Sequence, residues 1–210
     1  LINTVSNVIN QDINIKEKLK VIFIEDYGIS HAELLFPAAD VSEQISTTTK
    51  EASGTGNMKF MMNGAITLAT LDGANVEISR AVGEENIVLF GLKSHEVYEY
   101  YEKGNYNAME IYNNTGIKNI VDKLISGEKI TGFNVFPDLY NSLIKYNDPY
   151  FTLRDFESYK LAQEKINDLY RDFYRWNRMC LINIAKSGEF SSDNTIRKYA
   201  KDMWKIKSIN

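Results

Sequence analysis

Three short segments of the chain carry the pattern of β-strands. Residues 21–24 and 87–90 are continuous apolar runs rich in β-branched and aromatic side chains, which is typical of strands covered on both faces. Residues 66–71 are a weaker candidate that ends at the turn signal Asp72-Gly73. The hydrophobic pattern therefore predicts three buried strands in the first 90 residues.

Helical spacing separates these strands. Residues 58–65 carry apolar side chains at positions i, i+3, i+4 and i+7, and residues 40–46 and 75–81 are interpreted as two further helices. Strands that alternate with helices favour βαβ units and a parallel sheet. The predicted fold class is therefore α/β.

The chain after residue 90 reads as helical. Apolar stripes predict helices over residues 94–103, 117–125 and 137–146, a long helical stretch from Asp155, and a last helix behind the capping signal Ser191-Ser192-Asp193. Aromatic side chains fill many of these stripes. We interpret them as the contact faces of helices that pack on the sheet and on one another, which makes a helical C-terminal tail.

Composition argues against several function classes. The 210 residues carry 24 basic and 28 acidic side chains, a net charge of −4, which does not suit a nucleic-acid binder with a broad basic face or a polybasic membrane-surface protein. The single cysteine, Cys180, cannot form an internal disulfide, and no cysteine–histidine cluster has the spacing of a zinc site.

The sequence also lacks the features of a secreted or membrane-spanning chain. No apolar run approaches the roughly 18 residues of a membrane span, and the first residues lack the basic and apolar regions of a signal peptide. We therefore expect a cytoplasmic protein without a metal or a membrane partner. Asn113-Asn114-Thr115 fits the acceptor pattern for N-glycosylation, which a cytoplasmic chain does not use.

Residues 51–60 are the segment most suited to chemistry. Two glycines and small hydroxyl residues precede an amphipathic helix, so that the backbone can approach a ligand while free N–H groups point at it. The segment matches neither a Walker loop nor a dinucleotide-binding turn. We place Lys59 in the first turn of this helix, where the helix dipole opposes protonation of the amine. An anion site beside such an amine suits pyridoxal phosphate, which carries both a phosphate and an aldehyde. On these features alone a second interpretation stands, in which the glycines cap a helix and Lys59 is a solvated surface residue.

A longer pattern carries a family resemblance. Residues 37–46 and 51–59 closely resemble the cofactor segment of the α-glucan (glycogen/starch) phosphorylases, and further matches occur at residues 63–65, 72–77, 83–86 and 187–193. The resemblance runs nearly end to end. It implies the C-terminal part of such an enzyme, with a partial Rossmann-like sheet in the second lobe of a two-lobed glycosyltransferase fold. Residues 1–92 would be the βαβ part of the cofactor-binding lobe and residues 93–210 its helical continuation, while the N-terminal domain and the first part of the lobe would be absent.

The resemblance also implies roles for particular residues. Lys59 matches the lysine that forms the Schiff base with pyridoxal phosphate. The other cofactor-binding positions would be Gly54, Thr55, Gly56 and Tyr27, and the positions that bind glucosyl hydroxyls would be Glu51, Ser53 and Gly54. One departure is Gly28, which follows Tyr27 where many members carry arginine.

The implied reaction is phosphorolysis. The family transfers the terminal glucosyl unit of an α-1,4-glucan to inorganic phosphate and forms glucose 1-phosphate, and the complete enzyme is expected to be a homodimer. The family's allosteric sites, and the lysine and arginine that hold its phosphates, lie earlier in the chain. We therefore expect this fragment alone to be inactive. The alternative is a non-catalytic carbohydrate-binding or interaction module.

Overall fold

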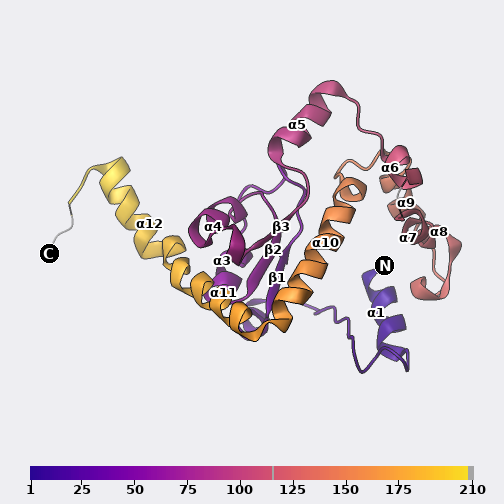
Figure 1. The fold of residues 1–210 in the computed structure, drawn as a ribbon, viewed down its shortest axis with the longest axis horizontal. Coiled ribbons are helices and arrows are strands. Elements are labelled where there is room, and N and C mark those ends of the chain that lie inside the picture. The colour runs from indigo at the N-terminus through magenta and orange to yellow at the C-terminus, as the bar shows by residue number, and fades with distance from the viewer. Residues whose placement is uncertain (115, 208–210) are drawn as a thin grey trace. The chain divides into compact units, whose positions relative to one another are not determined.

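The computed structural model describes residues 1–114 and 116–207 and shows two compact units (Figure 1). Unit 1 consists of Leu1–Ile29 and Tyr98–Glu157, and unit 2 of Ser30–Val97 and Ser158–Asn210. The predicted division at residues 92 and 93 remains a prediction. Thr115 of the glycosylation pattern lies outside the described residues.

Unit 2 is built on a parallel sheet. Its strands are β1 (Val41–Gln44), β2 (Ile66–Thr70) and β3 (Val88–Phe90), in the order β1-β2-β3. In the register, Val41 is opposite Ile66 and Leu68 is opposite Val88. All five residues of β2 are buried. The predicted strands at 66–71 and 87–90 and the parallel sheet are thus confirmed.

The predicted helix over residues 40–46 is wrong, because this segment contains β1. Its one fully buried side chain is Ser42, and Glu43 is exposed, so the strand carries little apolar signal of its own. Pairing with the buried strand β2 sets its conformation, a tertiary effect that overrides local pattern.

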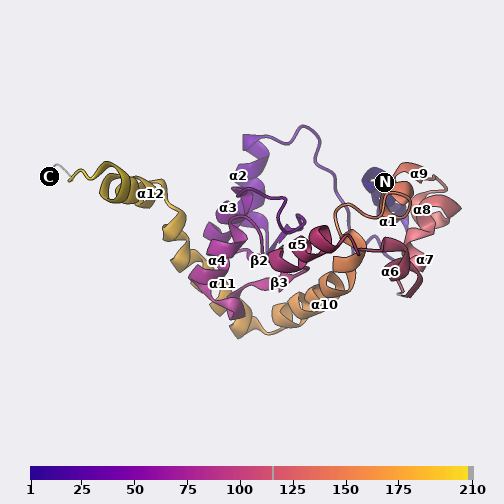
Figure 2. The ribbon, with the colours of Figure 1, turned by 90° about the horizontal axis from the view of Figure 1, so that it is seen from above.

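Helices cover both faces of this sheet. Helices α3 (Gly56–Met62) and α4 (Asn75–Val82) connect the strands and confirm two predicted helices. Figure 2 shows α3 and α10 (Thr152–Arg171) on opposite faces. One apolar cluster joins α3 and α4 to the start of β3, through Met61, Ile78, Val82 and Ile87. The other packs Ile66, Leu68 and Val88 against the helices α10 and α11 (Phe173–Lys186), through Ala162, Ile166, Leu169, Trp176 and Met179.

The C-terminal part of unit 2 is helical, as predicted. After α11 come the short turn Ser187–Phe190 and α12 (Ser192–Lys198), which continues into a π-helical stretch, Tyr199–Trp204. The predicted capping signal is confirmed, because the Ser191 hydroxyl accepts a hydrogen bond from the backbone N–H of Asn194 at 3.2 Å. The remaining elements of unit 2 are α2 (Ile29–Ala38), whose first residue belongs to unit 1, the turn Glu84–Asn86, and the start of α5 (Ser94–Lys103).

Unit 1 is a group of short helices. They are α1 (Ile2–Gln11), the end of α5, α6 (Ala108–Asn114), α7 (Lys118–Val121), α8 (Lys123–Ser126), the turn Lys129–Thr131, α9 (Pro137–Leu143) and the start of α10. The helix predicted over 117–125 is split between α7 and α8. The core of the unit consists of Ala108, Tyr112, Ile117, Val121 and Leu153.

The predicted strand at residues 21–24 is wrong. The segment forms no strand, and Ile22 and Phe23 are 73% and 57% exposed. Instead of a neighbouring strand, the Asn10 side chain pairs with the backbone of Val21, donating to its carbonyl at 2.7 Å and accepting from its N–H at 3.0 Å. An apolar run becomes a strand only where another strand supplies hydrogen-bond partners, and here a side-chain amide takes that place.

The fold class is therefore α/β, with a small parallel sheet and a helical C-terminal part. Within the described residues, no helix is both long and apolar enough to span a membrane.

Candidate functional site

The candidate site lies where the parallel strands of unit 2 end. The carboxyl ends of parallel strands meet at one edge of a sheet, which is where open α/β folds bind ligands. Two hydroxyl groups tie the loops together at this edge. The Thr70 hydroxyl donates to the Ser46 carbonyl at 2.6 Å, and the Thr48 hydroxyl donates to the Leu92 carbonyl at 2.7 Å. The loop after β1 is thereby attached to the end of β2 and to the loop after β3.

Asp72 shapes the middle of the loop after β1. Its carboxylate accepts hydrogen bonds from the backbone N–H groups of Lys50 and Glu51, at 3.1 and 2.8 Å. Hydrogen bonds to an ionised acceptor are roughly twice as strong as neutral ones. The turn after β2 therefore fixes the backbone from which the Glu51 side chain projects.

Gly73 allows the same turn to approach the loop closely. Its φ is +51°, and a Cβ at this position would lie 2.5 Å from the Ser53 carbonyl oxygen. That oxygen accepts a hydrogen bond from the Ala74 N–H at 2.8 Å. Both the backbone conformation and the contact require glycine here.

The structure brings the predicted glucosyl-binding residues together. Glu51 and Ser53 are exposed, and the Glu51 carboxylate accepts long hydrogen bonds of 3.4 Å from the Ser53 N–H and the Ser46 hydroxyl. Gly54 follows with φ +79°. An exposed carboxylate has lone pairs for further donors, so this arrangement can bind hydroxyl groups of a ligand.

A buried amide pair anchors the start of α3. The Asn57 side chain donates to the Asn75 side chain at 2.8 Å and accepts from the Met58 N–H at 2.9 Å. Asn75 in turn donates to the Thr70 carbonyl at 3.2 Å. The sequence reasoning missed these positioning roles, and those of Asp72 and Gly73, although these four residues lie in or beside the matched segments. The sequence feature that could have indicated them is an asparagine at the start of each of two consecutive helices, Asn57 in α3 and Asn75 in α4.

The backbone before α3 leaves room beside it. Thr55 caps the helix without a side-chain hydrogen bond, and a Cβ built on Gly56 would meet none of the described residues within 4 Å. A ligand phosphate can therefore approach Gly56 closely. The helix has only seven residues, so its dipole alone is a small attraction for an anion.

The structure corrects the predicted position of Lys59. Because α3 has only seven residues, Lys59, the fourth of them, also lies in its last turn, where the helix dipole does not oppose a cation. The Lys59 side chain is exposed, and its Nζ lies 5.6 Å from the centre of the Phe36 ring. Phe36 packs edge-to-face on Phe60 at 4.5 Å. The helix thus presents an accessible amine beside an aromatic pair, which fits an aldehyde-bearing aromatic cofactor.

Tyr27 belongs to unit 1 and is 57% exposed. Its predicted position beside the cofactor remains a prediction. At the neighbouring Gly28, a Cβ would meet just the Asp26 carbonyl oxygen, at an ordinary 3.8 Å. A larger side chain at residue 28 is therefore compatible with the local backbone.

Comparisons with known proteins agree with the matched segments. Residues 1–206 match the family described as carbohydrate phosphorylase. The chain is 51% identical over its whole length to glycogen phosphorylase of Bacillus subtilis and 49% identical to that of Synechocystis. Over 98% of the chain it is 45% identical to the muscle form of glycogen phosphorylase from Ovis aries. The chain spans about a quarter of the length of these relatives, 26%, 25% and 24% respectively.

Proposed function

Because the chain belongs to the carbohydrate phosphorylase family, we propose that it is part of a larger pyridoxal-phosphate-dependent enzyme. That enzyme would cleave terminal α-1,4-glucosyl units of glycogen or starch with inorganic phosphate and release glucose 1-phosphate. The observation that carries the proposal is the match over residues 1–206, which includes the ordered loop at the strand ends and the exposed amine of Lys59.

Lys59 would hold the cofactor. Its amine is accessible on α3, and the ring pair of Phe36 and Phe60 offers an apolar wall for a pyridine ring. The backbone of Gly54, Thr55 and Gly56 would lie against the cofactor phosphate, with Tyr27 as a further contact. When bound, the cofactor supplies a phosphate that can exchange a proton with substrate phosphate.

The loop after β1 would hold the sugar. The Glu51 carboxylate would accept hydrogen bonds from glucosyl hydroxyls, and Ser53 and Gly54 would supply further polar contacts. Hydrogen bonds from Lys50, Glu51 and Ala74 to the turn and the loop fix these groups before a ligand arrives. Such preorganisation lowers the cost of binding.

The complete enzyme would be a cytoplasmic homodimer, as the family resemblance implies. This chain alone would be inactive, because the resemblance places the phosphate-holding lysine and arginine in the part of the enzyme before it.

Reductive trapping tests the role of Lys59. The chain is incubated with pyridoxal phosphate, reduced with borohydride, digested and analysed by mass spectrometry. We expect the adduct on the peptide that contains Lys59 and its loss in Lys59→Arg, while Lys50→Arg, the same change in the loop that precedes α3, keeps it. Equal labelling of many lysines, or an adduct unaffected by Lys59→Arg, would contradict the proposal. Sugar binding without a Lys59 adduct would favour a non-catalytic carbohydrate-binding module.

A further inference from the structure

A strained residue lies in the middle of the loop after β1. Thr49 has φ +82°, in the left-handed region of backbone conformation. Glycine occupies two other such positions of the candidate site, Gly54 and Gly73. Threonine fits this region poorly, because its branched Cβ meets the neighbouring backbone. Of the residues with positive φ in the described part of the chain, Thr49 alone is β-branched, so the loop holds a conformation that its own residue disfavours.

The strained residue belongs to a β-turn. The Lys50 N–H donates to the Thr47 carbonyl at 3.0 Å, which closes a turn of four residues. Thr49 is the third of these residues, and Thr48, the second, has no positive φ. This combination is that of a type II turn, in which the third residue is usually glycine or asparagine. A type I turn has the same closing hydrogen bond but a third residue with φ of about −90°, which suits threonine.

The turn is anchored on both sides. Thr48 is 1% exposed, and its hydroxyl donates to the Leu92 carbonyl at 2.7 Å. On the other side, the N–H groups of Lys50 and Glu51 donate to the Asp72 carboxylate. Turns of types I and II differ mainly by a rotation of the peptide between the second and third residues. That rotation leaves the closing hydrogen bond and both anchors in place.

The peptide that would rotate is not held by hydrogen bonds of its own. Within the described residues, neither the Thr48 carbonyl nor the Thr49 N–H has a hydrogen-bond partner. Its rotation therefore breaks no hydrogen bond of the loop. The positive φ disfavours threonine by a factor of about 5–30, which the packing of the loop offsets in this structure. Two opposing effects of this size leave two conformations accessible.

We propose that the peptide between Thr48 and Thr49 is a conformational switch in the candidate site. Its rotation exchanges an N–H for a carbonyl on each side of the loop, two residues before Glu51. A ligand hydroxyl held by Glu51 distinguishes a donor from an acceptor, so it binds one state better than the other. The strained type II turn is the state that the ligand selects, since binding offsets the strain. That the ligand is a glucosyl unit rests on the proposed function.

Relaxation-dispersion NMR of the 210-residue chain tests the switch, because it detects exchange on the microsecond to millisecond timescale. We expect exchange at the amides of Thr49 and Lys50. Thr49→Gly and Thr49→Asn introduce residues that accept a positive φ, so they should lower the type I population about 5–30-fold. Thr49→Val stays β-branched and should keep the exchange. Thr55→Gly, at φ −130°, is the matched control and should also keep it.

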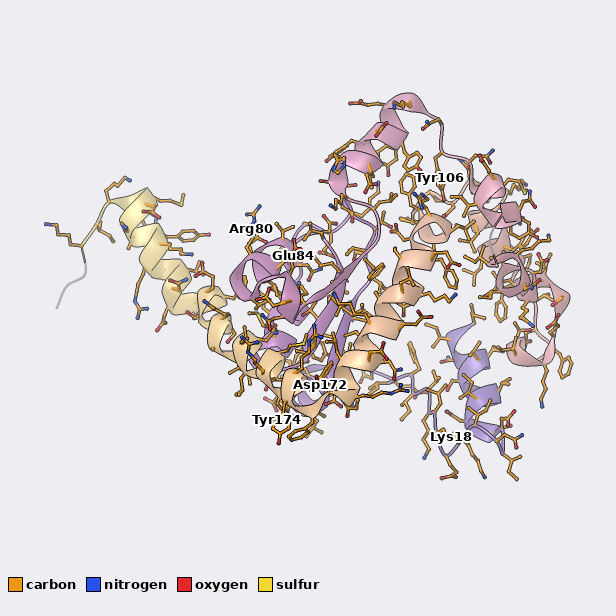
Figure 3. All side chains as sticks on the ribbon, in the orientation of Figure 1. Lys18, Arg80, Glu84, Tyr106, Asp172 and Tyr174 are labelled. Atoms are coloured by element: carbon orange, nitrogen blue, oxygen red, sulfur yellow. The ribbon has the colours of Figure 1, made fainter. Side chains whose placement is uncertain are left out.

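Two further measurements separate strain from general loosening. Asp172 and Tyr174, labelled in Figure 3, lie at the start of α11 in the same unit, and their amides should relax equally in all variants. The urea midpoint of Thr49→Gly should equal or exceed that of the unaltered chain, because relief of the strain offsets the extra freedom of unfolded glycine. A lower midpoint would mean that Thr49 is not strained and would overturn the inference.

Saturating maltoheptaose tests the ligand. It should suppress the exchange in the unaltered chain and leave it unchanged in Glu51→Ala. Absence of exchange at Thr49 in the free chain, or equal exchange in Thr49→Gly and Thr49→Val, would overturn the switch. Exchange that follows these variants but ignores the sugar would refute the proposed sugar-binding role of Glu51 alone. A Lys59 adduct in a chain without exchange would refute the switch and leave the proposed cofactor chemistry standing.

Discussion

Gly73→Ala is the sharpest test of how the site is built. At φ +51° a non-glycine residue costs about 1–2 kcal/mol. The new Cβ would lie 2.5 Å from the Ser53 carbonyl oxygen, so the loop must move, and the hydrogen bond from the Ala74 N–H, about 1 kcal/mol, is lost. We expect unit 2 to lose about 2–3 kcal/mol of unfolding free energy.

Gly54, in the loop after β1, and Gly56, the first residue of α3, serve as matched controls. Gly54 also has a positive φ, +79°, but its nearest neighbour would be an ordinary 3.6 Å from a Cβ, so Gly54→Ala adds backbone strain alone. Gly56 has no positive φ, and a Cβ there would meet none of the described residues within 4 Å. Because Gly56 is helical, Gly56→Ala should raise the unfolding free energy by up to about 1 kcal/mol.

Urea unfolding followed by tryptophan fluorescence measures the series, because Trp176 is buried in the core of unit 2. We expect Gly73→Ala to be the least stable variant, Gly54→Ala to be intermediate, and Gly56→Ala to equal or exceed the unaltered chain. Amide exchange at Ala74 should accelerate in Gly73→Ala alone. If Gly73→Ala were no less stable than Gly54→Ala, the close contact between turn and loop would not exist as described.

Two further predictions concern the cores. In the same assay, Met61→Ala should lower the free energy of unfolding by about 2–5 kcal/mol, because Met61 is fully buried. Met62 is 53% exposed, so Met62→Ala should lower it by less than about 0.5 kcal/mol. Equal losses in the two variants would contradict the orientation of α3. In unit 1, burial and then the Asp148 carboxylate raise the pKa of Tyr106 far above its ordinary value of 10.0. The folded state therefore keeps a proton that the unfolded state releases, so the free energy of unfolding should fall as the pH rises above about 10. In thermal melts recorded across that pH range, Tyr106→Phe should make this fall less steep. The same dependence on pH in both proteins would refute the assignment.

The sheet illustrates what the sequence could and could not predict. The strands β2 and β3 were predictable because both are rich in apolar residues, and β2 is buried along its whole length. The strand β1 was not, because its polar residues are held by the partner strand rather than by their own pattern. Residues 21–24 show the opposite error. Their strongly apolar pattern predicted a strand, but no strand lies beside them in the described residues, and the backbone of Val21 pairs with the Asn10 side chain instead.

The candidate site divides in the same way. The glycines and Lys59 were singled out as candidates because close backbone approach and a reactive amine have local signatures, and Glu51 was singled out by the family resemblance alone. The roles of Asp72 and Asn75 were not, because their contacts join segments about twenty residues apart, and spacing alone does not show which backbone groups they meet. The position of Lys59 in α3 depended on where that helix ends, which local pattern predicts poorly.

The contact between Asp72 and the loop after β1 also sets an order of events during synthesis. Lys50 and Glu51 are synthesised before the turn that fixes them, because their hydrogen-bond partner, Asp72, lies 22 and 21 residues later in the chain. Chains emerge from the N-terminus onward, so this loop cannot take its final conformation before Asp72 and Gly73 have been synthesised. The candidate site is therefore completed only after both β1 and β2 have left the ribosome.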